Sequence, residues 1–251
     1  MDATGKIIVA LDTERDTALK IAKQISSNAA VYGFKINRSV DQEVFRKDGE
    51  PSFFEELAKL GKPVWVDIKL NDVPRTVAGR IQPYADSGMV NYITVMASGG
   101  IPMMRAAVEA GLAGKPDDLE REVKTSIIAV TVLTSLSEEE AQLIYGHLSK
   151  ASVIYLAQKV VLAGIEYLVC SANEVQVIRS RLELNSLKLF VPGITPDWKE
   201  KKAPDQCRVG SPAFALINGA DKLVIGSAIV NADDPLEALE KTVVEINEIN
   251  K

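Results

Sequence analysis

Eight short apolar runs, separated by longer stretches of helical periodicity, are the feature that most constrains the fold of this 251-residue chain. The runs predict strands at Ile7–Leu11, Val31–Ile36, Val64–Lys69, Tyr92–Val95, Ser126–Val130, Tyr167–Cys170, Leu187–Val191 and Leu223–Ile225. Between them, apolar residues recur every three or four positions, as at Ala18, Ile21, Ala22 and Ile25, which places one apolar stripe along a helix. Strands that are apolar on both faces and alternate with helices are typical of a parallel sheet.

The number of these units and the chain length together favour a closed barrel. Eight strand–helix units in about 250 residues fit a (β/α)8 or TIM barrel, an α/β fold whose functional site lies at the C-terminal ends of the strands. An open, doubly wound sheet is the alternative. The sequence contains no linker-like or low-complexity segment, so we expect a single barrel domain over residues 1–251.

Composition excludes several classes of protein. With 47% hydrophobic and 25% charged residues, the chain has the composition of a soluble globular protein. No apolar stretch approaches the roughly 20 residues of a membrane span, and no secretion signal is recognisable, so we expect a cytoplasmic protein. Its two cysteines, Cys170 and Cys207, suit a reducing compartment. A net charge of −5 argues against a nucleic-acid partner but not against a small anion bound by a local cluster of lysines.

Charged residues follow the third apolar run, in the segment VDIKLNDVPRT at residues 66–76. Asp67 and Lys69 lie two residues apart on a strand, so they point the same way. We expect both to face the barrel interior, because the outward direction would bury charge among apolar helices. Other strand ends offer Asp12, Lys35 and Thr134. The alternative is a buried ion-pair network that only fixes the fold.

The same segment, DIKLNDVPRTV, resembles the DxKxxDIPxT signature of the orotidine 5′-phosphate decarboxylase family. Further segments resemble other blocks of that family in the family's order: IIVALD, the second-strand Lys35, AVTVLTS, VCSANE, PGI, DQCR and GADKLVIG. The resemblance covers essentially the whole chain. It implies decarboxylation of orotidine 5′-monophosphate (OMP) to uridine 5′-monophosphate (UMP), in pyrimidine synthesis, without a metal or organic cofactor.

The resemblance also assigns residues. The catalytic charges it implies are Lys35, Asp67, Lys69 and Asp72. The substrate-binding residues it implies are Asp12, Thr76, Thr134, Ser135, Pro192, Thr195, Gln206, Gly226 and Ser227. Within the second set, Asp12 matches a residue that holds the ribose hydroxyls, and Gln206 matches one that holds the phosphate. In the family, the second aspartate of the signature reaches the neighbouring subunit's site, so we expect a homodimer in which Asp72 and Thr76 complete the partner's site.

These residue types suit the reaction. Loss of CO₂ from C6 of the pyrimidine leaves a carbanion, which requires a matched electrostatic environment and a proton donor already in place. Lys69, between Asp67 and Asp72, is expected to stay protonated and to deliver that proton. Asp67 would lie near the substrate carboxylate, where two like charges about 4 Å apart repel by roughly 4 kcal/mol at an effective dielectric constant near 20.

Three positions depart from the family pattern. Thr195 and Ser227 stand where the family usually has arginines directed toward the phosphate, and Met96 replaces a usual histidine. Compensating charge is available in the segment TPDWKEKKAPDQCR, and backbone amides near Gly226 and Ser227 can also face an anion. The candidate cations in that segment are Lys199, Lys201, Lys202 and Arg208.

Two other functions remain open. One is a metal-dependent sugar-phosphate lyase on a similar barrel, whose relatives carry an acidic metal ligand where this chain has Lys35. The other is a degenerate barrel that binds a phosphorylated ligand without turnover, a possibility motivated by Thr195 and Ser227.

Overall fold

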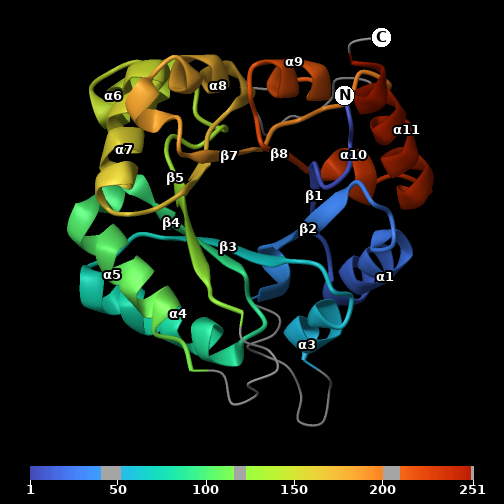
Figure 1. Cartoon of the computed structure of the whole chain (residues 1–251), viewed down its shortest axis with the longest axis horizontal. Helices are drawn as coiled ribbons and strands as arrows, with labels where there is room; N and C mark the ends of the chain where they lie inside the picture. Colours follow the sequence, from blue (N-terminus) through green and yellow to red (C-terminus); the bar gives the residue numbers. More distant parts are fainter. Residues whose placement is uncertain (41–51, 116–122, 200–209, 250–251) are drawn as a thin grey trace.

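The computed structural model describes residues 1–40, 52–115, 123–199 and 210–249. Its eight parallel strands pair in sequence order and close into one barrel (Figure 1). They are β1 (Ile7–Ala10), β2 (Val31–Ile36), β3 (Val64–Leu70), β4 (Tyr92–Met96), β5 (Ser126–Val130), β6 (Tyr167–Val169), β7 (Lys188–Val191) and β8 (Lys222–Ile225). The predicted (β/α)8 barrel is confirmed, and the open sheet is wrong because β8 pairs with β1.

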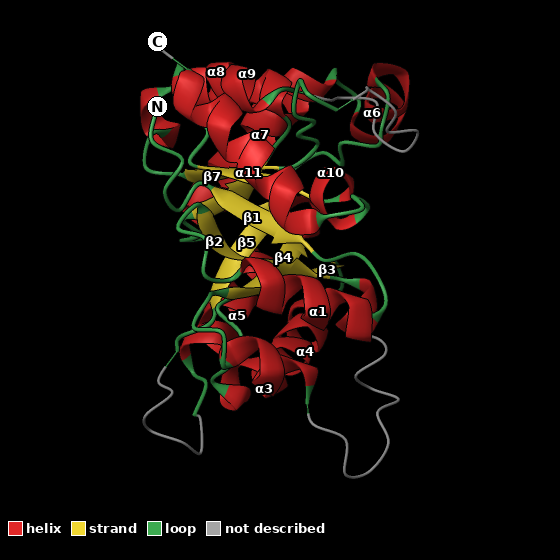
Figure 2. Cartoon of the chain, turned by 90° about the vertical axis from the view of Figure 1, so that its right-hand side faces the viewer, coloured by secondary structure: helices red, strands yellow, loops and turns green. Residues whose placement is uncertain are grey.

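Helices surround the barrel (Figures 1 and 2). They are α1 (Arg15–Ile25), α3 (Phe53–Ala58), α4 (Pro74–Ser87), α5 (Gly100–Leu112), α6 (Glu138–Tyr145), α7 (Ser149–Leu162), α8 (Ala172–Arg179), α9 (Pro212–Ile217), α10 (Ser227–Val230) and α11 (Pro235–Glu248), with short 3₁₀ turns at Ala97–Gly99 and Leu182–Leu184. The apolar stripe predicted on α1 is buried: Ala18, Ile21, Ala22 and Ile25 all face the core. Within the described part of the chain, no helix is both long and apolar enough to cross a membrane.

We propose that the chain forms one domain. The two ends of the described chain meet, since the Met1 ammonium donates a hydrogen bond to the Ile249 carbonyl at 2.6 Å. In Figure 1 the N-terminus accordingly lies beside α11.

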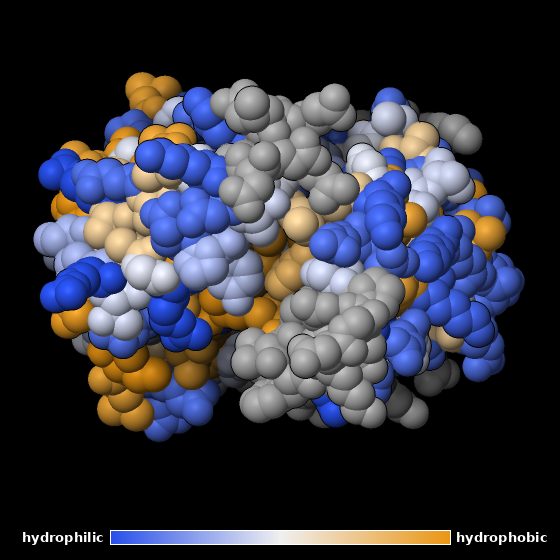
Figure 3. Space-filling model, turned by 90° about the horizontal axis from the view of Figure 1, so that it is seen from below, coloured by the Kyte–Doolittle hydropathy of each residue, from blue (hydrophilic) through white to orange (hydrophobic). Residues whose placement is uncertain are grey.

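Charged and polar side chains cover much of the outer face in Figure 3, with apolar residues gathered mainly on the left of that view.

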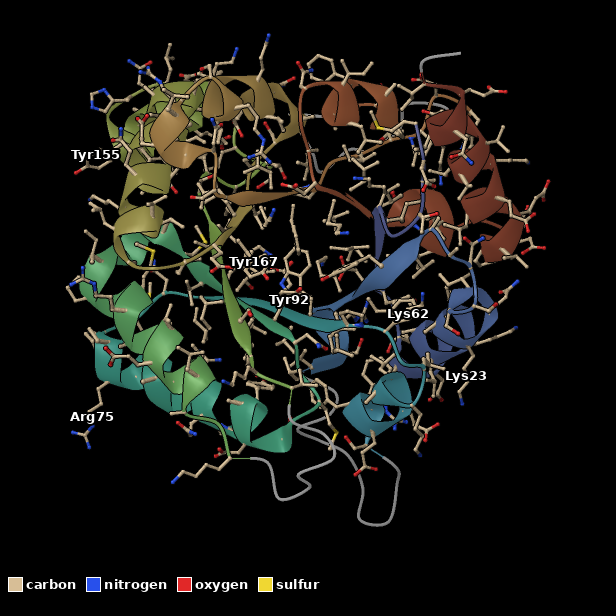
Figure 4. All side chains as sticks on the ribbon, in the orientation of Figure 1. Lys23, Lys62, Arg75, Tyr92, Tyr155 and Tyr167 are labelled. Carbon is tan, nitrogen blue, oxygen red and sulfur yellow. The ribbon has the colours of Figure 1, made fainter. Side chains whose placement is uncertain are left out.

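Side chains fill the barrel interior in layers. Odd-numbered strands supply one apolar layer, which is Ile8, Trp65, Ile128 and Phe190. Toward the N-terminal ends of the strands, the even-numbered strands supply Tyr32, Tyr92, Tyr167 and Lys222. Tyr92 and Tyr167 pack ring to ring inside the barrel, with centroids 5.2 Å apart (Figure 4). These large side chains fill the N-terminal end of the barrel, and in barrels of this kind ligands bind at the C-terminal ends of the strands.

Candidate active site

A cavity of about 560 Å³ opens at the C-terminal ends of the strands. Its polar and charged lining residues lie on the strands or in the segments that follow them, and they are far apart in the sequence: Asp12, Lys35, Asp67, Lys69, Thr134, Thr195, Ser227 and Asn231. Trp65, Val130, Val169 and Val224 supply apolar surface. A concave site with a few convergent polar groups on an apolar wall is typical of a small-molecule site.

Two lysines converge on one buried carboxylate in the wall of this cavity. The Asp67 Oδ2 oxygen lies 2.9 Å from Lys69 Nζ and 3.1 Å from Lys35 Nζ. Lys35 Nζ also donates to both carboxylate oxygens of Asp12, each at 3.0 Å. Only 7% of the Asp67 side chain and 8% of the Lys35 side chain is exposed, whereas Lys69 is 35% exposed and Asp12 49%. The buried charges are therefore paired, and the more exposed ends of the array face the cavity.

Burial and ion pairing shift the pKa values of Asp67 and Lys35 in opposite directions. Burial alone raises the pKa of the Asp67 carboxyl, but Lys35 and Lys69 outweigh it and hold that pKa below its ordinary value. Burial alone lowers the pKa of the Lys35 ammonium, but Asp67 and Asp12 outweigh it and hold that pKa above its ordinary value. Both groups are therefore charged throughout the neutral pH range.

The end of β3 is irregular, and the irregularity places Lys69. The register between β3 and β4 shifts between Val66 and Leu70, and Lys69 has φ +47°, the single positive φ at a non-glycine position among the described residues. The displaced backbone is held by Thr94 of β4, whose Oγ1 accepts from the Lys69 N–H at 2.9 Å and donates to Asp67 Oδ1 at 3.0 Å. A strained backbone fixed by a neighbouring side chain is common where a functional group must be aimed.

Asp67→Asn is expected to reduce the loss of unfolding free energy as the pH is lowered. Because the folded-state pKa of Asp67 lies below its ordinary value of 3.8, its contribution to the unfolding free energy is present above that value and is lost as pH falls through the folded-state pKa. Denaturant unfolding at a series of pH values between about 5 and 2 measures this slope. Wild-type protein should lose more stability than Asp67→Asn over that interval, and equal slopes would contradict the pairing.

The structure brings most of the predicted site residues to one cavity. Lys35, Asp67 and Lys69 line it, together with the predicted substrate-binding residues Asp12, Thr134, Pro192, Thr195, Gly226 and Ser227. Asp72, Thr76 and Ser135 are exposed and do not belong to its lining within this chain. Figure 4 shows Arg75, beside Thr76, directed away from the barrel. Gln206, Lys201, Lys202 and Arg208 lie outside the described residues.

Sequence reasoning missed several residues of this site. Thr94 is fully buried and bonds both Asp67 and the Lys69 backbone, and its signal was a polar residue in the middle of the apolar run YITVM. Asn37, which directly follows β2, donates from its side-chain amide to the Asp67 carbonyl. Trp65 and Asn231 line the cavity, and nothing local in the sequence distinguishes them from structural residues.

The sequence matches a protein-family model and curated relatives over most of its length. Residues 5–242 match the family model described as the orotidine 5′-phosphate decarboxylase / HUMPS family. The chain belongs to this family. Among its curated relatives, the orotidine 5′-phosphate decarboxylase of Dichelobacter nodosus is 37% identical over 235 residues, covering 93% of this chain and 95% of that protein. The enzyme of the same name from Pseudoalteromonas translucida is 38% identical over 240 residues, covering 95% of each.

Solved structures of decarboxylases from this family share the fold. The orotidine 5′-phosphate decarboxylase of Lactobacillus acidophilus superposes with a TM-score of 0.75 at 25% identity, covering 96% of this chain and 99% of that one. The orotidine 5′-monophosphate decarboxylase of Methanocaldococcus jannaschii, in complex with the inhibitor BMP, superposes with a TM-score of 0.72 at 18% identity, covering 98% and 100%. The family and barrel predicted from the sequence are therefore confirmed.

Proposed function

We propose that this chain is a carboxy-lyase that converts OMP to UMP, with Lys69 as proton donor to C6. The observation that carries the proposal is the array in which the buried Asp67 carboxylate contacts both Lys35 and Lys69 on the cavity wall. Family membership and curated relatives named orotidine 5′-phosphate decarboxylase support the substrate.

The arrangement suits the charge changes of decarboxylation. When the bond between C6 and the carboxylate breaks, its electron pair stays on C6 and CO₂ leaves. Lys69 then gives a proton from Nζ to that carbon, which neutralises the carbanion. The paired Lys35 and Asp67 are fixed before the reaction begins, so they stabilise the developing charge without reorganising. Asp67 disfavours the substrate carboxylate by like-charge repulsion, which ends when CO₂ departs.

The metal-dependent alternative is less well supported by this site. The position where those relatives carry an acidic metal ligand holds Lys35, whose ammonium is committed to Asp67 and Asp12. Among the described residues, no three side chains of histidine, cysteine, aspartate or glutamate cluster in a way that could hold a metal ion.

A direct assay tests the proposed reaction. OMP is mixed with the protein in EDTA and the fall in pyrimidine absorbance is followed, with the product identified as UMP by chromatography. Turnover in EDTA, unchanged by added magnesium, supports the proposal. Absence of turnover with OMP would contradict it, and magnesium-dependent turnover of a sugar phosphate would favour the lyase instead.

We propose that two chains share their sites. Asp72 and Thr76 lie exposed at the rim, outside the cavity lining of their own chain, and the neighbouring Val73 side chain is 61% exposed. Pro74 begins α4 and restricts the backbone between them. Exposed carboxylate, hydroxyl and apolar groups on one rim segment suit contact with a second copy, in which Asp72 joins the partner's Lys69 array.

Adding a cation at the β8 end should improve use of the nucleotide. Ser227 lines the cavity where the family pattern has an arginine, so Ser227→Arg is expected to raise kcat/KM for OMP by about tenfold through a charge-assisted contact with the phosphate. Steady-state kinetics at low salt measures the change, with Ser227→Gln as an uncharged polar control. Equal values for both variants would contradict phosphate binding at this end.

A further inference from the structure

The part of the cavity wall formed by β8 and by the segments after β7 and β8 has no charged side chain among its described lining residues. It consists of Pro192, Gly193, Ile194, Thr195, Val224, Gly226, Ser227, Val230 and Asn231. The cations elsewhere in the lining, Lys35 and Lys69, are both paired with Asp67. The described residues of this wall can offer a phosphate dianion only neutral contacts, so a charge-assisted contact requires a cation from outside the wall.

Lys199 brings a cation to this wall. Its Nζ donates to the Ser227 carbonyl oxygen at 2.7 Å, so the ammonium reaches a residue that lines the cavity. An ammonium carries three donors, and this bond uses one of them. Among the described residues, no carboxylate forms an ion pair with Lys199.

The backbone that carries Lys199 is fixed on α11. The Asp197 N–H donates to Glu245 Oε2 at 3.0 Å, and Trp198 Nε1 donates to Thr242 Oγ1 at 3.2 Å. Thr242 is fully buried on α11 and donates in turn to the Ala238 carbonyl at 2.9 Å. Both residues that precede Lys199 are thus bonded to one rigid helix.

The backbone on the N-terminal side of Lys199, directly after β7, is fixed as well. The Thr195 N–H donates to the Gly210 carbonyl, and the Gly210 N–H donates to the Gly193 carbonyl, each at 3.0 Å. Four backbone or side-chain bonds therefore set where the Lys199 main chain lies relative to Ser227.

We propose that Lys199 is a phosphate-binding cation of this chain and that Glu245 and Thr242 of α11 act as positioning residues through Asp197 and Trp198. The inference rests on the proposed function, because it takes a nucleotide 5′-phosphate as the ligand. The charge comes from the segment after β7 instead of from the position that follows Gly226. A lysine is a compact point charge without the bidentate geometry of arginine, so the contact depends on how well its backbone is held.

Binding of product measures this contact without turnover. The affinities of UMP and uridine, which differ only by the phosphate, are determined by calorimetry at low salt, and their ratio reports the phosphate contact. Lys199→Met is expected to lower that ratio by about tenfold or more, while Lys199→Arg largely retains it. The matched control is Lys188→Met, which removes the same charge from the exposed first residue of β7, at the opposite end of the barrel.

The same ratio of UMP to uridine affinity tests the positioning role of α11. Thr242→Val and Trp198→Phe each remove one partner of the same hydrogen bond and are expected to lower the ratio by a few-fold, with little change in uridine affinity. A purely structural role would lower both affinities together. In the Lys199→Met background, the same substitutions should have no further effect on the ratio, because the group that they position is gone.

The outcomes separate this inference from the proposed function. If wild-type protein decarboxylates OMP but folded Lys199→Met keeps the wild-type ratio, Lys199 is not the phosphate cation although the reaction stands. If wild-type protein binds UMP no better than uridine, the inference is also overturned. If the ratio falls in Lys199→Met while OMP is not turned over, the phosphate contact stands and the assigned reaction is wrong.

Discussion

Lys69→Ala is expected to lower kcat for OMP at least about a hundredfold, because it removes the proton donor and one of the two cations that contact Asp67. The fold should persist, since the Lys69 side chain is 35% exposed and Asp67 keeps its contacts with Lys35 and Thr94. Absorbance kinetics gives kcat, and circular dichroism with size-exclusion chromatography reports folding and assembly.

A matched control separates the role of Lys69 from a general loss of charge. Lys150→Ala removes an exposed lysine from the first turn of α7, away from the cavity lining, and should leave kcat unchanged. If folded Lys69→Ala keeps more than about a tenth of wild-type kcat, less than about 1.4 kcal/mol of transition-state stabilisation was lost, and the proton-donor role is wrong.

Mixing two inactive variants should restore activity if sites are shared between subunits. Asp72→Ala and Lys69→Ala are each expected to be nearly inactive as homodimers. A heterodimer contains one site with both residues intact, so free exchange of equal amounts should give about a quarter of wild-type activity. The comparison is between the activity of the mixture and that of each variant alone, after exchange under mild denaturant.

The activity of the mixture tests the shared site only if the two variants are shown to exchange subunits. Differently tagged variants, isolated as a two-tag species, provide the heterodimer directly and should show about half of the wild-type activity per dimer. A purified heterodimer without activity would overturn the shared site. A protein that remains monomeric at assay concentration while turning over OMP would overturn it as well.

The barrel was predictable from the sequence because its determinants are local. A strand buried on both faces needs a short apolar run, and a helix packed on the outside of the barrel needs an apolar stripe with a period near 3.6. The strand signal repeats eight times, and all eight predicted strands are present with ends that shift by one residue at most. The charged residues at strand ends were also visible, because a charge next to a buried strand has few structural explanations.

The geometry of the charged array depended on the tertiary structure. The sequence argument for Asp67 and Lys69 used regular strand alternation, but β3 is irregular there and Lys69 has φ +47°. Both side chains still line the cavity, because Thr94 on the next strand bonds the displaced backbone. That contact joins residues 25 apart, and no local pattern encodes it.

The proposed phosphate-binding part of the cavity also depended partly on the sequence and partly on the tertiary structure. The sequence by itself determined that Thr195 and Ser227 lack the charge of the usual arginines and that Lys199 is one of several nearby cations. Only the tertiary structure placed Lys199 Nζ on the Ser227 carbonyl and fixed its backbone to α11. Side-chain identity and local periodicity are properties of the chain, whereas the meeting of β7, β8 and α11 is decided by closure of the barrel, which brings distant segments into contact.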